Sequence, residues 1–139
     1  MKYMLDTNIC IYAIKHKPEA VIQRFLRHDP EEMCISAVTY AELMHGVEKS
    51  RAVEKNRIAI SLFLSPITVL EFHALAAEEY GKIRAQLEKK GTRSIGPMDL
   101  LIAGHARSEG LILVTNNTRE FERVEGLRVE DWAQDEGIE

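Results

Sequence analysis

Short apolar runs alternate along this chain with longer segments that have helical periodicity, and this alternation restricts the possible folds more than any other feature. The runs cover residues 2–5, 33–36, 68–70, 111–114 and 127–129, and helices are expected over 7–15, 18–28, 38–49, 52–64, 73–90 and 97–110. Such alternation is typical of an α/β fold with a mainly parallel central sheet covered by helices on both faces. The fully apolar run 111–114 suits the centre of that sheet. With 139 residues, the chain is predicted to form one domain, 1–139, with a polar C-terminal tail from about 133 to 139.

The composition excludes several classes of protein. No apolar run approaches the length of a membrane span, and the N-terminus shows no apolar core of a signal peptide, so we expect a cytoplasmic protein without a membrane partner. The two cysteines, Cys10 and Cys34, form no CxxC pair. We therefore expect buried free thiols rather than a metal site or a disulfide.

The formal net charge is -4, but the charge is unevenly distributed along the sequence. Five basic residues and one acid lie between positions 82 and 93, whereas eight acids and two arginines follow from position 120 onward. The distribution of charge decides more about a nucleic-acid partner than its sum. The basic stretch is either a solvated helix face or a surface that contacts nucleic acid.

Three acids occupy positions where an α/β fold could gather them. Asp6 closes the first apolar run, at the sheet edge where ligands bind in parallel sheets. Glu42 lies beside the apolar row that Tyr40 begins in the helix over 38–49, with Leu43, Met44 and Val47. Asp99 begins an apolar row in the helix over 97–110, with Ile102, Ala103 and Ala106. Thr115, Asn116 and Asn117 end the run 111–114 at the same edge as Asp6.

Each of these residues also has an ordinary structural role. Asp6 could cap a helix, Asp99 could interact with a helix N-terminus, Glu42 could be a surface acid, and Thr115 to Asn117 could form a turn. If the fold brings the acids together, however, their mutual repulsion calls for a cation between them. Oxygen ligands without Cys or His select Mg²⁺ or Mn²⁺, and ions of this kind suit phosphodiester hydrolysis.

Four segments in a fixed order carry a resemblance to a known family: MLDTN (4–8), SAVTYAELMHGVEKS (36–50), IGPMDLLIAGHAR (95–107) and LILVTNNTREFERVEGLRVEDW (111–132). Together they resemble the VapC-type PIN-domain ribonuclease toxins of bacterial VapBC toxin–antitoxin modules. The resemblance implies a PIN fold and an Mg²⁺-dependent endoribonuclease, with Mn²⁺ as a possible substitute. It further implies cleavage of initiator tRNA in the anticodon stem-loop and neutralisation by a VapB antitoxin.

The resemblance also implies roles for particular residues. The catalytic acids of the family fall on Asp6, Glu42 and Asp99, of which Asp6 and Asp99 would bind the metal directly. Asn8 and Thr115 match positions that line the site. The chain departs from the pattern at Asn117, where many relatives carry a fourth acid. Because an amide adds no negative charge, a second ion would arrive only with RNA, unless Glu120 replaces the missing acid.

Candidate RNA-contact positions are basic: Lys49, Arg51, Lys82, Arg84, Lys89, Lys90 and Arg93. The resemblance implies a homodimer, a heteromeric complex with VapB, and binding to operator DNA only through the antitoxin.

Other functions fit the residues less well. A haloacid-dehalogenase-type phosphatase needs a second Asp two positions after the first, where this chain has Asn8, and a receiver domain needs a Lys after its last strands. A degenerate, non-catalytic PIN module, or a ribonuclease acting on mRNA or rRNA, are the remaining alternatives.

Overall fold

The computed structural model describes residues 1–91 and 95–133, and its centre is a five-stranded sheet. The strands are β1 (Tyr3–Leu5), β2 (Met33–Ser36), β3 (Thr68–Leu70), β4 (Ile112–Val114) and β5 (Val129–Glu130). Their order is β3-β2-β1-β4-β5, and every neighbouring pair is parallel. The predicted parallel α/β architecture is confirmed.

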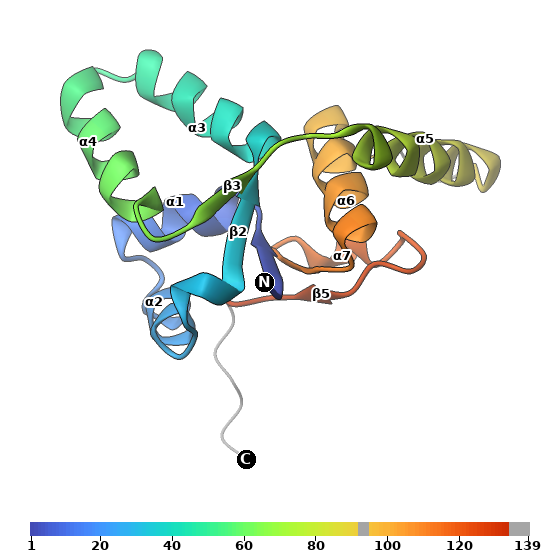
Figure 1. The fold of residues 1–139 in the computed structure, drawn as a ribbon, viewed down its shortest axis with the longest axis horizontal. Coiled ribbons are helices and arrows are strands. Elements are labelled where there is room, and N and C mark those ends of the chain that lie inside the picture. The colour runs from blue at the N-terminus through green and yellow to red at the C-terminus, as the bar shows by residue number, and fades with distance from the viewer. Residues whose placement is uncertain (92–94, 134–139) are drawn as a thin grey trace.

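Helices cover both faces of this sheet (Figure 1). Helices α1 to α4 lie on one side, and α5, α6 and the short α7 lie on the other. The helices are α1 (Thr7–Lys15), α2 (Glu19–Leu26), α3 (Ala37–Glu48), α4 (Val53–Leu64), α5 (Ala74–Lys89), α6 (Pro97–Glu109) and α7 (Thr118–Phe121), with a 3₁₀ turn η1 over Pro30–Glu32. Within the described ranges, none of these helices combines the length and the apolar character that crossing a membrane requires.

The three central strands, β1, β2 and β4, are short and buried on both faces, so their alternate residues pack into two separate cores. Leu5 and Ile35 pack with the α1–α4 layer, whereas Met4, Cys34 and Leu113 pack with α5, α6 and α7. The prediction for the cysteines is confirmed, because Cys10 and Cys34 are both buried free thiols.

The register of the sheet brings the chain ends of β1 and β4 to the same edge. Leu5 pairs with Val114, and the backbone N–H of Asp6 donates to the Val114 carbonyl at 2.9 Å. The carboxyl ends of parallel strands therefore place Asp6 and Thr115 next to each other, where such sheets bind ligands.

Three local expectations differ from the structure. The last strand covers Val129–Glu130 rather than 127–129, and α7 follows β4 where only a turn was expected. In α3 the buried row contains Thr39, Leu43 and Val47, while Tyr40 is 41% exposed. Leu43 and Val47 are buried and Met44 is partly buried, as predicted, so only the first position of the row is wrong: Thr39 is buried in place of Tyr40.

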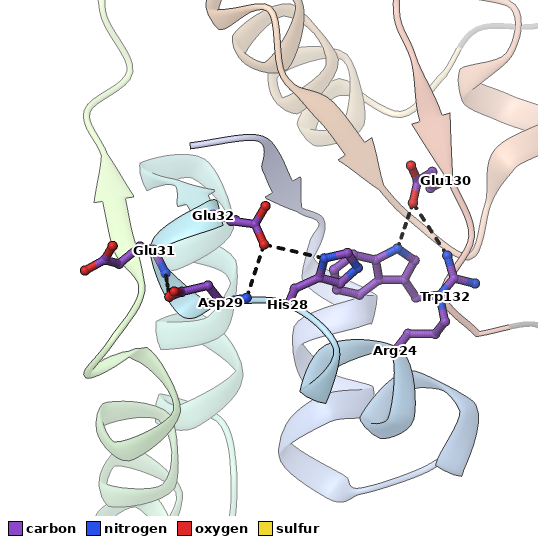
Figure 2. Close-up of polar contacts among 7 residues, drawn as sticks. All are labelled: Arg24, His28, Asp29, Glu31, Glu32, Glu130 and Trp132. Atoms are coloured by element: carbon purple, nitrogen blue, oxygen red, sulfur yellow. Dashed lines mark hydrogen bonds and ion pairs between the residues drawn. The ribbon is translucent and has the colours of Figure 1, made fainter.

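The last described residues are anchored by an aromatic cluster (Figure 2). Trp132 is fully buried and stacks on His28 with ring centroids 4.8 Å apart. Its indole N–H donates to Glu130 at 3.1 Å, and the same carboxylate pairs with Arg24 at 3.5 Å. The fold thus extends to Ala133, and the rest of the predicted polar tail lies outside the described residues.

Helices α5 and α6 approach each other closely at Gly104. A Cβ atom at this position would lie 2.7 Å from the backbone nitrogen of Tyr80. Only glycine permits this distance, and the contact fixes α6, which carries Asp99 in its first turn. Residues 92–94, which precede α6, lie outside the described ranges.

Candidate active site

Asp6 is the most constrained acid of the chain. It follows β1, is 5% exposed, and caps α1 by accepting the Ile9 N–H at 2.9 Å. The buried Thr115 hydroxyl also hydrogen-bonds the Asp6 carboxylate, and Thr115 itself accepts the Asn117 N–H at 2.9 Å. Asp6 therefore does cap α1, and its side chain is held by hydrogen bonds from Ile9 in α1 and from Thr115 at the end of β4.

The pKa of Asp6 is raised from 3.8 to about 6. Burial is the main cause, because it penalises the charged form. The hydrogen bonds from Thr115 and Ile9 act in the opposite direction, and the charges of Asp99 and Glu42 raise the pKa further. Because the charges of Asp99 and Glu42 act on Asp6, the fold places the three predicted acids near one another.

Glu42 reaches this site from α3. It is half-buried, and its Oε1 accepts the Thr7 hydroxyl at 2.5 Å. Thr7 is the residue after Asp6, so this hydrogen bond ties the acid of α3 to the start of α1. The position of Glu42 beside the buried face of its helix agrees with the prediction.

Asp99 enters the site from the first turn of α6, where Pro97 starts the helix. It is half-buried, and its pKa is raised by burial and then by the charges of Glu42 and Glu120. The buried residues Ile102, Ala103 and Ala106 follow on the same face of α6, as expected.

These acids suit a hard divalent cation. The donor set is carboxylate oxygen with hydroxyl groups nearby, and burial together with like charge makes the ionised acids unfavourable without a counter-charge. The carboxylate oxygens of Asp6, Glu42 and Asp99 are not all within 4.8 Å of one another. The described residues contain one set of three ligand-type side chains with donor atoms all within 4.8 Å of one another, and it is a different, histidine-containing set. A wider spacing is expected for acids that repel each other.

The remaining predicted site residues lie at the rim. Asn8 and Asn117 are exposed, and Asn117 occupies the N-cap position of α7 without a side-chain capping bond. Glu120, on α7, acts electrostatically on Asp99 but also pairs with Arg123 at 2.5 Å. The short helix that sequence reasoning missed thus brings Glu120 near the acids, and an arginine partly balances its charge.

Three of the seven basic candidates for RNA contact are engaged in ion pairs on the surface. Lys82 lies 3.2 Å from Glu79, Arg84 bonds Tyr80 and Glu88, and Lys90 lies 2.9 Å from Glu125. Lys49, Arg51 and Lys89 are exposed. Arg93 lies outside the described residues. The role of these positions in RNA binding stays a prediction.

Two residues of the site were not anticipated from the sequence. Thr7 orients Glu42, and the Tyr12 hydroxyl accepts the Asn116 amide at 3.0 Å, which joins α1 to the end of β4. The signal for Thr7 was present, because it stands between Asp6 and Asn8 in the motif that carried the resemblance. Nothing in the sequence pattern singled out Tyr12.

Comparison with known proteins identifies the family of this chain. Residues 3–127 match the PIN domain family. The chain is 57% identical over 133 residues to the tRNA(fMet)-specific endonuclease VapC of Shigella flexneri, covering 96% of this chain and 99% of the relative. It is 52% identical to the homologous endonuclease of Salmonella typhimurium, covering 95% and 98%.

Solved structures give the same result. The chain superposes on a chain of the DNA-bound VapBC complex from Salmonella typhimurium with a TM-score of 0.88 at 52% identity, covering 95% of this chain and 98% of that one. The promoter-bound VapBC2 complex of Rickettsia felis gives a TM-score of 0.87 at 42% identity, covering 95% and 99%. Sequence and fold both show that this chain belongs to the PIN-domain family, among its VapC proteins.

Proposed function

We propose that this chain is the toxin of a type II toxin–antitoxin module and cleaves RNA as a divalent-metal-dependent endoribonuclease. The observation that carries the proposal is the convergence of Asp6, Glu42 and Asp99 from three distant segments, each affecting another electrostatically. The relatives named for cleavage of initiator tRNA share more than half of their residues with it. We accordingly propose initiator tRNA, cut in the anticodon stem-loop, as the substrate.

In this proposal, Asp6 and Asp99 hold Mg²⁺ or Mn²⁺, and Glu42 either completes the ligand set or orients the attacking water. An ion bound there would activate water and neutralise charge that develops on the phosphate. The protein supplies the positioning: Thr115 and the N-terminus of α1 fix Asp6, and Thr7 fixes Glu42.

A cleavage assay tests the proposal directly. Purified protein is incubated with total RNA and Mg²⁺, and the new 5′ ends are sequenced. We expect cuts within the initiator tRNA anticodon stem-loop, loss of these cuts with EDTA, and loss of at least 100-fold in rate for Asp6→Asn. Asp29→Asn is the matched control, since Asp29 is also an aspartate N-cap but is exposed and remote in sequence from the acids.

Each alternative has its own outcome in this experiment. New ends in mRNA or rRNA, with the same dependence on Asp6, would keep the enzyme class and replace the substrate. RNA that stays intact with every metal, while the protein still binds VapB, would show a degenerate binding module and overturn the proposal.

Asn117 bears on the number of ions. With an amide at this position and Glu120 paired to Arg123, we propose one metal site formed by the protein alone and a second ion that enters with RNA. Isothermal titration is expected to show one Mg²⁺ site without RNA. Two tight sites in the free protein would contradict this part of the proposal.

The proposed partner is a VapB antitoxin, which would also supply any contact with operator DNA. A groove between α1, α3 and α4 is lined mainly by apolar residues, and one of the candidate catalytic acids is part of its lining. Its lining includes Ile11, Ile14, Leu43, Val47 and Glu42. An apolar VapB segment in this groove would place a neighbouring arginine beside the acids, where it could displace metal.

A pair of substitutions on α4 tests this interface. Ala59 lines the groove, whereas Ile58 is 58% exposed and does not line it. We expect Ala59→Arg to cleave RNA normally and to resist inhibition by VapB at least tenfold, and Ile58→Arg to remain fully inhibited. Equal inhibition of both variants would place VapB elsewhere.

A further inference from the structure

A second group of metal-ligating side chains lies where α5 meets α6. It consists of His73, His105 and Glu109, whose candidate ligand atoms all lie within 4.8 Å of one another. His73 is the N-cap of α5, His105 is on the inner face of α6, and Glu109 is the last residue of α6. Proposed catalysis uses none of these residues.

His105 has an unsatisfied ring nitrogen. The residue is fully buried, and its Nδ1 lies 2.8 Å from the Ser36 hydroxyl oxygen. Its Nε2 is buried and has no hydrogen-bond partner among the described residues. Buried polar atoms almost always have partners, so an exception asks for an explanation such as a bound ion.

His73 and Glu109 complete the group from its exposed side. The His73 Nδ1 accepts the Ala76 N–H at 3.2 Å, so its other nitrogen, Nε2, faces the Glu109 carboxylate at 2.5 Å. The rings of His73 and His105 are nearly perpendicular, with centroids 5.3 Å apart. The side chains of His73 and Glu109 each retain 36% of their accessible surface, so an ion can reach the group from solvent.

We propose that His73, His105 and Glu109 bind a divalent transition-metal ion of the zinc class. Two imidazole nitrogens and one carboxylate form a donor set that favours zinc over magnesium. Tetrahedral coordination at ordinary zinc–ligand distances requires donor atoms about 3.4 Å apart. Side-chain movements of about 1 Å would bring the present arrangement to that spacing. Without the ion, the Nε2 proton of His73 is shared with Glu109. Binding of the ion at Nε2 would move this proton to Nδ1, so the bond from the Ala76 N–H to Nδ1 would be lost.

The surroundings of His105 suit a metal ligand. Burial lowers the pKa of His105, because it penalises the charged ring. The Ser36 hydroxyl oxygen can accept a hydrogen bond from Nδ1–H of His105, which leaves Nε2 as the ligand atom. Hydrogen bonds of this kind commonly orient metal-binding histidines. The ion would join the start of α5 to the end of α6, across a chain separation of 36 residues.

Cobalt binding tests this site in the full-length protein, without reference to RNA cleavage. The metal-free protein is titrated with Co²⁺, and the visible absorption of four-coordinate cobalt is recorded. We expect one such ion per chain, displaced by Zn²⁺ but not by excess Mg²⁺. At 100-fold excess over its Kd, Zn²⁺ should raise the melting temperature by about 8 °C.

Substitutions locate the ion. His73→Ala and Glu109→Gln change partly exposed residues and should abolish the four-coordinate signal and the zinc-dependent rise in melting temperature. His45→Ala, an exposed histidine on α3, should retain both, and so should Asp6→Asn. The proposal is overturned if His73→Ala and Glu109→Gln bind Co²⁺ like the unchanged protein, or if Asp6→Asn removes the signal.

Discussion

Replacing Asp6 with Asn should stabilise the metal-free protein while it abolishes the proposed activity. The pKa of Asp6 rises from 3.8 to about 6, mainly through burial. At about 1.4 kcal/mol per pKa unit, ionised Asp6 lowers the free energy of unfolding by about 3 kcal/mol at neutral pH. Asn keeps an oxygen to accept the Ile9 N–H and is as good an N-cap as Asp. The substitution therefore removes the charge and keeps the cap.

The pH dependence of this effect follows from the sign of the shift. The folded protein holds the Asp6 proton more tightly than the unfolded chain does. Ionised Asp6 therefore lowers the free energy of unfolding very little below pH 3.8, and by nearly the full amount above about pH 6. Relative to the unchanged protein, Asp6→Asn should gain about 3 kcal/mol at pH 7.5, about 1.6 kcal/mol at pH 5 and about 0.5 kcal/mol at pH 4.

Urea unfolding at these three pH values, with EDTA present, measures the gain. Asp29→Asn serves as the control, because Asp29 is an exposed N-cap that accepts the Glu31 N–H at the same distance, 2.9 Å. Added Mg²⁺ should stabilise the unchanged protein but not Asp6→Asn, so the two curves should converge. A variant that is less stable than the unchanged protein at pH 7.5, or a gain that does not shrink toward pH 4, would refute the reasoning.

Three further experiments test the fold and the basic surface. Gly104→Ala should lower the free energy of unfolding in urea by about 1–3 kcal/mol, because its Cβ would lie 2.7 Å from the α5 backbone. Gly81→Ala, the control, has open space around its Cβ and should raise the free energy of unfolding by about 0.5–1 kcal/mol. Equal effects of the two variants would contradict the packing argument. Trp132→Ala should cost about 3–5 kcal/mol, measured by circular dichroism; a loss below 1 kcal/mol would show that the C-terminal anchor contributes little. Lys89→Glu combined with Lys90→Glu should slow RNA cleavage and reduce its salt dependence with little change in melting temperature, and unchanged cleavage at several salt concentrations would exclude this surface.

The sequence was informative where one physical rule connected local pattern to global position. Parallel strands place their carboxyl ends at one edge, so Asp6 and Thr115 could be paired without coordinates. The helical periodicity of α6 correctly placed Asp99 at the head of a buried row. These inferences required only the element type and its direction.

Other features depended on contacts that no local pattern records. Tyr40 was assigned to the buried row of α3, but Thr39 and Tyr40 both stand at helical spacing from Leu43, so periodicity did not distinguish them. The four-residue α7 is too short for periodicity to reveal. The buried His105 depends on Ser36, 69 residues away, and the Trp132 anchor depends on His28. Such long-range pairings become visible only when the chain is folded.

The charge balance around Asp99 supports the proposal that a second ion enters only with RNA. Among the described residues, no arginine or lysine forms a hydrogen bond or ion pair with Asp6, Glu42 or Asp99, whereas Glu120 pairs with Arg123. Three carboxylates balance one divalent cation with a single negative charge to spare, which is too little to hold a second cation firmly. The scissile phosphate supplies the missing negative charge. Under this proposal, the second metal site is assembled when the RNA substrate binds, and the free protein holds one ion.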